Sequence, residues 1–280
     1  IPTLAILEDG IDIMLDVYKE ICYTHGHLTR KRPMQKGYSL RKESLLPFLQ
    51  KLASYEKQLL EHKQKNRSKY ITDELLNSFT KDDKVDMEGY KQAYLKKNFN
   101  TDSVKNICHE YLKGINWVIT YYKQGIPDWK WYYPYFYAPF LEDIIFYLDT
   151  YKDKVFIKGQ PVDLLLQLLC VLPPQSSELL PSILQTIMIQ PSFRSYYPKK
   201  IEIDTSGKRK EWEGIVKLPM IDLIKIEKEF ENKKKQFDYK IKNINKFGTN
   251  FLYSYSDNEL FFQSYYGNFK SKCTHILIDF

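Results

Sequence analysis

The nine residues from Trp129 to Tyr137 are the densest group of side chains with a recognisable chemistry. Seven of the nine are aromatic, against 15% of the whole chain. Flat rings on a protein surface stack with unpaired nucleic-acid bases, and each stacked base contributes about 1–3 kcal/mol. The run also suits a packed core corner, because Pro127, Pro134 and Pro139 break any helix and rings fill irregular gaps. The two interpretations are compatible if the tyrosines are core and one tryptophan is surface.

Residues that would bind a metal ion are present but are poorly arranged. Cys22, His25 and His27 are close in sequence, yet no second pair follows at the spacing of a zinc site. The neighbouring acids Glu142–Asp143 and Glu211–Glu213 are of a type that binds Mg²⁺, but a helix start and a solvated strand face explain them. A glycine-rich phosphate loop and a nucleophile elbow are absent from the sequence. We therefore predict no catalytic residue and no metal ligand in this chain.

The charge balance is moderately basic. The chain has 42 Lys and Arg residues against 35 Asp and Glu residues, which gives a net charge of +7. This favours a polyanionic partner but is also common in ordinary soluble proteins. The stretch from Lys225 to Lys246 holds eight lysines against four acids, and is either a solvated helix face or a basic patch beside nucleic acid.

Apolar periodicity predicts a mainly helical chain that positions these groups. The predicted helical segments are residues 11–22, 45–59, 104–122, 164–172 and 179–189. The helix over 104–122 ends near Gly125 and leads directly into the aromatic run. Strands are predicted at 212–218 and 251–255. The polar segment 63–91 predicts a mobile loop or a partly ordered excursion.

The cysteines and the hydropathy indicate a compartment. Four cysteines in 280 residues give no disulfide framework, which favours a reducing, intracellular environment. The sequence has no run of 18 apolar residues and no signal-peptide layout, so no membrane partner is predicted. Because no Met precedes Ile1, we expect the sequence to begin inside a longer one.

Several motifs resemble those of a known enzyme family. The stretch Tyr111–Pro139 resembles the YVEGLxWVLxYYYxGxPSWxWYYPYHYAP signature of the Xrn-type 5′-to-3′ exoribonucleases. Residues 161–181, PVDLLLQLLCVLPPQSSELLP, resemble the family's PFEQLLxVLPxxSxxLLP, and residues 196–222 resemble its FYPxxFxxDxNGKxxxWEAVVLIPFID. Ile1–Tyr18 is similar to the sequence after the family's GNDFLPH box, and Asn245–Gly248 to its RNxFG. The resemblance runs, with gaps, from residue 1 to about residue 250.

This resemblance implies a division of labour within a larger enzyme. In the family, the acids that bind Mg²⁺ and the pocket for the 5′-phosphate belong to an N-terminal conserved region, which ends just before the point matching Ile1. Residues 1–250, including the excursion 63–91, would be the second conserved region, a helical layer around an absent α/β nuclease core. Residues 251–280 would be a C-terminal extension with a strand-like start. The parent enzyme would degrade 5′-monophosphorylated single-stranded RNA processively, and this chain alone would not.

The resemblance also implies site residues. In the family, a tryptophan from the segment matching SWxWYYP closes a column of stacked bases. Trp129 and Trp131 both fit, and Trp131 is favoured because it directly abuts the YYP turn. The family's Ser is Asp128 here, and the histidine of YPYHYAP is Phe136. No role that depends on that histidine carries over.

Two other functions remain open from the sequence alone. One is a helical protein-binding scaffold whose aromatic corner is entirely core. The other is a single-strand nucleic-acid-binding module without catalysis. Within the family, the short 63–91 excursion resembles the cytoplasmic members, whereas Ile1–Leu4 resembles the start of the nuclear ones, and we favour a cytoplasmic location.

Overall fold

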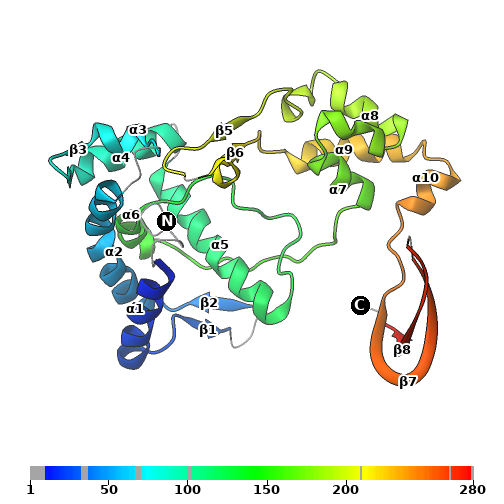
Figure 1. Ribbon diagram of the computed structural model, residues 1–280, viewed down its shortest axis with the longest axis horizontal. Coiled ribbons are helices and arrows are strands. Elements are labelled where there is room, and N and C mark those ends of the chain that lie inside the picture. The colour runs from blue at the N-terminus through cyan, green and yellow to red at the C-terminus, as the bar shows by residue number, and fades with distance from the viewer. Residues whose placement is uncertain are drawn as a thin grey trace. The chain divides into compact units, whose positions relative to one another are not determined.

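The computed structural model describes residues 10–32, 37–66, 71–99, 103–208, 210–264 and 266–278. Most of the regular structure in this part of the chain is helical, which confirms the predicted fold class (Figure 1). The α-helices are α1 (Gly10–His25), α2 (Lys42–Lys65), α3 (Glu74–Ser78), α4 (Met87–Phe99), α5 (Val104–Gln124), α6 (Leu141–Leu148), α7 (Leu164–Val171), α8 (Ser182–Ile189), α9 (Leu223–Lys234) and α10 (Tyr239–Ile244). Short 3₁₀ turns lie at Pro174–Leu179, Arg194–Tyr196 and Glu211–Glu213.

The strands form small antiparallel hairpins. The pairs are β1 (Thr29–Lys31) with β2 (Tyr38–Leu40), β3 (Thr80–Lys81) with β4 (Lys84–Val85), β5 (Glu202–Asp204) with β6 (Ile215–Lys217), and β7 (Phe251–Ser264) with β8 (Gly267–Leu277). The strand predicted at 212–218 is shorter than expected, because Glu211–Glu213 forms a 3₁₀ turn. For the same reason these two acids do not lie on a strand face. The strand predicted at 251–255 is longer, because it pairs with β8 up to Ser264.

The contacts divide the chain into two compact units. The first comprises residues 1–161 and 194–223, and the second comprises residues 162–193 and 224–280. The aromatic run lies in the first unit, and the lysine-rich stretch from Lys225 to Lys246 lies in the second. The domain boundary that the sequence predicts at residue 250 stays a prediction.

The helix α5 is shared by two hydrophobic clusters of the first unit. Cys108 and Leu112 pack in a cluster with buried residues of α1, α2 and α6, whereas Ile107 belongs to a second cluster with α3 and α4. All three side chains are fully buried. Burying one large apolar side chain contributes about 1.5–3 kcal/mol, so the helix is held from two sides. The end of α5 is fixed by Gly125, whose φ of +82° favours glycine and whose N–H bonds the Tyr121 carbonyl.

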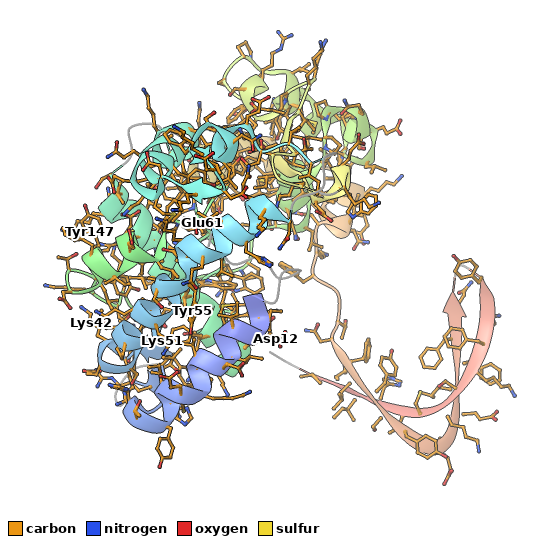
Figure 2. The ribbon with its side chains drawn as sticks, turned by 60° about the vertical axis from the view of Figure 1, so that its left-hand side comes forward. Asp12, Lys42, Lys51, Tyr55, Glu61 and Tyr147 are labelled. Atoms are coloured by element: carbon orange, nitrogen blue, oxygen red, sulfur yellow. The ribbon has the colours of Figure 1, made fainter. Side chains whose placement is uncertain are left out.

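The helices α1 and α2 lie side by side along the outside of the first cluster. Figure 2 shows Lys42, Lys51 and Glu61 along α2, with Asp12 on α1 next to it. Val17 and Ile21 of α1 are buried in the cluster, and the Lys51 ammonium lies 3.5 Å from a Glu20 carboxylate oxygen. Apolar spacing predicts both helices. The predicted face of α2 packs through Leu45, Leu49 and Leu52, whereas α1 packs through Val17 and Ile21 and exposes Ile11 and Leu15.

The second cluster contains the end of the aromatic run. Phe140 is fully buried, and the rings of Tyr90 and Tyr94 approach it edge-on, with centroids 6.0 Å and 5.1 Å away. The Tyr94 hydroxyl donates to the Ala138 carbonyl at 3.0 Å, so its polar group is satisfied inside the cluster. The C-terminal end of the aromatic run is therefore core.

The polar segment 63–91 is more regular than its composition predicts. The described part, 63–66 and 71–91, contains the end of α2, the helix α3, the β3–β4 hairpin and the start of α4. Leu76 and Val85 supply the few apolar side chains that anchor it in the second cluster. The hairpin turn places Asp82 and Asp83 at φ of 49° and 60°, a conformation that Asp tolerates better than most residues. These two aspartates thus shape a turn.

The acids Glu142 and Asp143 serve the first turn of α6, as the sequence suggests. The Lys91 ammonium lies 2.9 Å from an Asp143 oxygen and 3.3 Å from a Glu142 oxygen. Burial raises the pKa of Asp143, and the bond from Lys91 opposes that rise. This pair ties α4 to α6, since leaving one buried charge without its partner is costly.

The second unit has its own apolar interior. Leu169 of α7, Leu184 of α8, and Ile226 and Phe230 of α9 are all fully buried. The start of α7 is fixed by Asn245, whose side-chain oxygen accepts the Leu165 N–H at 3.0 Å. On β8, only Cys273 is buried, so the long hairpin exposes most of its side chains. Among the helices that the structure describes, none is both long and apolar enough to cross a lipid bilayer.

Replacing Leu112 with Ala should destabilise the first unit by about 2–5 kcal/mol, because the change removes buried volume between α5 and its neighbours. Val118, on the same helix but 46% exposed, provides the matched control. Val118→Ala should change the free energy of unfolding by no more than about 0.5 kcal/mol. Urea unfolding followed by circular dichroism measures both, and equal losses would contradict the packing described for α5.

Candidate nucleic-acid interface

The chain that follows α5 is pinned in place by Asp128. One Asp128 carboxylate oxygen accepts the N–H groups of Lys130 at 2.9 Å and Trp131 at 3.0 Å. The Asp128 carbonyl accepts the indole N–H of Trp117, on α5, at 3.1 Å. The Trp129 N–H bonds the Lys158 carbonyl at 3.2 Å. Aspartate in place of the family's serine thus keeps a side-chain acceptor that holds the turn.

Trp131 is half-buried and firmly anchored on α5. Its indole N–H donates to a Glu110 carboxylate oxygen at 2.9 Å, and the Lys113 ammonium lies 5.0 Å from its ring centroid. Gly114 allows the close approach, since a Cβ at that position would lie only 3.1 Å from the ring. The ring of Phe156 lies 6.1 Å away and contributes a further contact. Much of the surface of the Trp131 side chain is therefore covered by other residues of the protein.

Trp129 is more open. Its side chain is 40% exposed, and its backbone N–H is bonded, so the ring projects from a fixed position. An exposed indole on a fixed backbone has the surface that base stacking requires. The structure thus gives the two tryptophans that the sequence predicts different environments.

Two further rings belong to this surface. Trp117 and Tyr121, one helical turn apart on α5, are stacked at 5.3 Å with an interplanar angle of 11°. The Trp117 ring lies 6.3 Å from that of Trp131, and Tyr121 is 43% exposed. We call Trp117, Tyr121, Trp129 and Trp131 the aromatic surface. The sequence prediction missed the first two, although their four-residue spacing on a predicted helix places them on one face.

A basic pocket adjoins the aromatic surface. It has a volume of about 220 Å³ and is lined by Asn106, His109, Glu110, Lys113, Thr150, Tyr151, Lys152 and Lys154. Glu110 and Lys113 are the two residues that also hold the Trp131 ring. We call this site the lysine pocket. A single strand that stacks a base on the aromatic surface would bring its phosphates toward these ammonium groups.

The lysine pocket is positive. Glu110 is paired with Lys113 at 3.7 Å, and among the described residues no carboxylate lies within ion-pair distance of Lys152 or Lys154. The pKa of His109 is lowered, first by burial and then by nearby lysines, so this imidazole adds no charge at neutral pH. Its Nε2 lies 3.1 Å from the Thr150 hydroxyl. The pocket therefore suits an anion.

Three of the tyrosines of the aromatic run, Tyr133, Tyr135 and Tyr137, are partly buried, whereas Tyr132 is 46% exposed. The ring of Tyr133 meets those of Tyr111 and Tyr135 edge-on at 5.8 Å and 5.4 Å, and its hydroxyl donates to the Tyr137 carbonyl at 2.8 Å. Burial raises the pKa of Tyr133, which keeps the phenol neutral. Phe136, which replaces the family's histidine, is 38% exposed. The run thus packs through Tyr133, Tyr135 and Tyr137, and is exposed at Trp129, Tyr132 and Phe136.

The residues considered for metal binding do not converge. Cys22 Sγ lies 3.5 Å from His27 Nδ1, which also lies 2.9 Å from the Tyr18 hydroxyl. Within the described ranges, no group of three or more His, Cys, Asp or Glu side chains is placed to hold a metal ion. The side chains of this part of the chain do not fit a Mg²⁺ site.

Comparison with known proteins agrees with the motif resemblance. Residues 72–278 match a sequence family described as the Xrn1 helical domain. The chain is 40% identical to "5'-3' exoribonuclease 2" of Debaryomyces hansenii over 145 residues, which cover 48% of this chain and 14% of the relative. It is 34% identical to the Candida albicans protein of that name over 202 residues, or 62% of this chain and 21% of the relative. With "5'-3' exoribonuclease 1" of Saccharomyces cerevisiae, the identity is 28% over 279 residues, or 91% of this chain and 18% of the relative. The chain therefore spans only about a fifth of each relative, or less.

The two tryptophans should differ in their contribution to stability. Trp131→Ala removes a hydrogen bond, a cation–π contact and the packing of a half-buried ring. Truncating a fully buried Trp lowers the free energy of unfolding by about 3–5 kcal/mol, and Trp131→Ala should lower it by a substantial part of that amount. Trp129→Ala removes an exposed ring and should cost about 0.5 kcal/mol or less. Thermal melting of the two variants measures the difference. If Trp129→Ala melts as early as Trp131→Ala, the ring of Trp129 is core rather than surface.

Proposed function

Because this chain belongs to the Xrn family of 5′-3′ exoribonucleases, we propose that it forms the part of such an enzyme that guides single-stranded RNA and stacks its bases. The observation that carries the proposal is the exposed Trp129, whose N–H is bonded to the Lys158 carbonyl and which lies two residues before Trp131, the ring that Glu110 and Lys113 of the lysine pocket hold. The parent protein would degrade RNA from a 5′-monophosphate end. We propose this activity for the whole protein, with single-stranded RNA and the catalytic region as the partners of this chain.

The chemistry of the two sites supports a single strand as the ligand. A base in a duplex is already stacked on both sides, whereas an unpaired base can place its face on an indole. Stacking tolerates every base, and ammonium groups beside the rings attract the backbone whatever the sequence. An aromatic surface with an adjacent lysine pocket therefore favours binding that is independent of sequence, which an enzyme needs when it moves along RNA.

The two tryptophans would have separate roles. Trp131, bonded to Glu110 and covered by Lys113, would hold the turn after α5 in a fixed position relative to the lysine pocket. Trp129, with its larger exposed fraction, would present the stacking face. The sequence favoured Trp131 for stacking because of its place before the YYP turn, and exposure favours Trp129. The two assignments predict opposite results for the substitutions below.

The hydrolytic step would belong to another region of the protein. Hydrolysis of a phosphodiester by a two-metal mechanism needs carboxylates that converge on Mg²⁺. No such group fits among the described residues, so we derive no metal-dependent step from this chain. Its proposed contribution is to hold the strand, because positioning a substrate removes an entropic part of the barrier. We propose a cytoplasmic location, which rests on the short 63–91 segment alone.

Trp129→Ala in the complete protein should weaken the binding of single-stranded RNA by about 1–3 kcal/mol, because one stacked base is lost. The slope of the logarithm of the RNA association constant against the logarithm of the salt concentration should stay unchanged, since no phosphate contact is removed. Binding is measured by fluorescence anisotropy with a 5′-phosphorylated oligonucleotide at several salt concentrations. Trp212→Ala is the matched control, because Trp212 is 80% exposed and lies outside the aromatic surface.

The control should bind RNA like the unchanged protein. If Trp131→Ala, but not Trp129→Ala, weakens binding by the folded protein, then Trp131 is the stacking residue. If neither variant weakens it, the stacking proposal is wrong.

A fragment of residues 1–280 should not degrade 5′-monophosphorylated RNA in the presence of Mg²⁺, because its described residues provide no converging acids. Addition of the family's N-terminal region should restore 5′-to-3′ degradation. Release of labelled nucleotides, followed over time for both preparations, measures this. Activity of the fragment that persists through independent purification schemes would overturn the division of labour. Restored RNA binding without degradation would instead favour a binding module without catalysis.

A further inference from the structure

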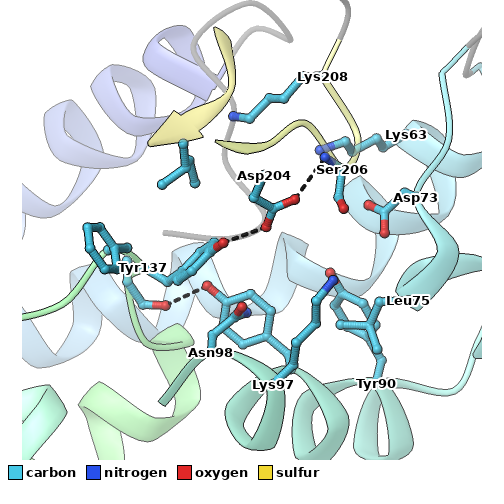
Figure 3. Close-up of a pocket in the computed structure, with 14 residues that line it drawn as sticks. Lys63, Asp73, Leu75, Tyr90, Lys97, Asn98, Tyr137, Asp204, Ser206 and Lys208 are labelled. Atoms are coloured by element: carbon cyan, nitrogen blue, oxygen red, sulfur yellow. Dashed lines mark hydrogen bonds between the residues drawn. The ribbon is translucent and has the colours of Figure 1, made fainter. Parts of the chain in front are cut away.

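A second pocket of the first unit has features of a ligand site and is separate from the aromatic surface. It has a volume of about 300 Å³, at the lower end of the range for small-molecule sites. Figure 3 shows it between α4, the residues before α3, and the β5 end of the β5–β6 hairpin. The lining residues are Lys63, Asp73, Leu75, Tyr90, Tyr94, Lys97, Asn98, Phe136, Tyr137, Ala138, Asp204, Ser206, Lys208 and Ile215. None of the residues of the aromatic surface or the lysine pocket is among them.

Three lysines from distant parts of the sequence converge on this pocket. Lys63 comes from the end of α2, Lys97 from the end of α4 and Lys208 from the loop after β5. In the part of the chain that the structure describes, no carboxylate lies within ion-pair distance of any of the three ammonium groups. Three ammonium groups around one cavity repel each other and outnumber the two carboxylates that line it, so an anion between them would be attracted.

The two carboxylates of the pocket are already engaged. Asp204 accepts the hydroxyl of Tyr137 and, at 2.9 Å, the N–H of Ser206. Burial alone would raise the pKa of Asp204, but these bonds and the nearby Lys97 outweigh it and lower the pKa to about 2. Asp73 accepts the Leu76 N–H at 3.1 Å and caps α3. Both acids therefore hold the walls of the pocket, and the three lysines outnumber them.

The rest of the lining suits a flat polar ring. Phe136 and Tyr137 form one wall, and Tyr90 and Tyr94 contribute aromatic edges. The side-chain oxygen of Asn98 is buried and accepts no hydrogen bond from the described residues. A buried acceptor without a donor is unfavourable by about 1–3 kcal/mol, so a ligand N–H placed there would be stabilising. Cations, an aromatic wall and an unsatisfied acceptor together match a phosphate joined to a base.

We propose that this pocket binds a free nucleoside monophosphate, with its phosphate among Lys63, Lys97 and Lys208 and its base against Phe136 and Tyr137. The pocket holds a single nucleotide, and its walls are fixed by the Tyr137–Asp204 and Tyr94–Ala138 hydrogen bonds. Only the source of the ligand rests on the proposed function: cleavage from a 5′ end releases nucleoside monophosphates. The residues involved are different, so the two proposals fail separately.

The test uses the complete protein and adenosine 5′-monophosphate as the probe. An azido derivative of this nucleotide, activated by light, should label peptides that contain Lys97, Tyr137 or Lys208. Unmodified adenosine 5′-monophosphate should compete, and adenosine should compete at least about tenfold more weakly, because charge-assisted bonds to phosphate are the strongest in the site. Labelling confined to other regions would overturn the proposal, as would equal competition by adenosine.

Two adjacent lysines give a matched pair of variants. Lys97→Gln should reduce labelling of the pocket at least about tenfold, whereas Lys96→Gln, one residue earlier on the exposed end of α4 and outside the pocket, should not change it. Both positions are exposed, so both variants should fold, and thermal melting checks this. Equal labelling of the two variants would contradict the proposal.

A second arm separates the free nucleotide from RNA. An unphosphorylated single-stranded oligonucleotide should not displace the nucleotide from this pocket, and its own binding should not depend on Lys97. If the oligonucleotide displaces the probe and Lys97→Gln weakens RNA binding instead, the pocket belongs to the RNA path and the proposal is wrong. The RNA affinity of Trp129→Ala, measured separately, reports on the aromatic surface alone.

Discussion

The burial of α5 on both sides is the constraint on which the first unit depends. One side of the helix fills the core with α1, α2 and α6, and another fills the cluster around Phe140. The remaining side carries Trp117 and supports Trp131, with Gly114 as the point of close approach. A helix held in this way cannot rotate, since rotation would expose Leu112 or displace Trp131. The aromatic surface therefore has a rigid base, and the proposed stacking of bases would carry no added entropic cost of ordering it.

The aromatic run resolves a conflict between two demands on flat side chains. Rings that stack with a ligand must be exposed, but exposed rings lose the stabilisation that burial provides. The chain divides the two demands among its residues: Trp129, Tyr132 and Phe136 are exposed, Trp131 is half-buried, and Phe140 is fully buried. Asp128 makes this separation possible, because it binds the N–H groups of Lys130 and Trp131 and so fixes where the chain leaves the helix.

The sequence predicted the parts of this arrangement that follow from local pattern. Helical spacing identified α1, α2 and α5, and the Tyr111–Pro139 motif identified the family, whereas the stacking role of Trp129 or Trp131 stays a prediction. The β1–β2 and β3–β4 hairpins were missed, because strands of two or three residues are too short to show a recognisable alternation of apolar and polar residues. The segment 63–91 was predicted to be a mobile loop or a partly ordered excursion, because its few apolar residues, such as Leu76, are isolated in sequence and only meet in the fold. Pockets were not predictable, since Lys63, Lys97 and Lys208 have no local signal that would join them.

The two groups of lysines differ in how the protein holds them. Lys113 is fixed by Glu110 and by the Trp131 ring, so its charge is partly compensated and its geometry is set before any ligand arrives. Lys63, Lys97 and Lys208 form no ion pair among the described residues, and of the two carboxylates in their pocket, that of Asp204 is held by Tyr137 and Ser206. A lysine whose charge is partly compensated and whose position is fixed would suit an RNA backbone that slides past it, because tight binding at each phosphate would slow the movement of the RNA. Three ammonium groups around one pocket with two carboxylates suit a small anion that stays, because the excess positive charge remains for the ligand. Under the two proposals, the same side-chain chemistry would therefore support two kinds of binding within one helical unit.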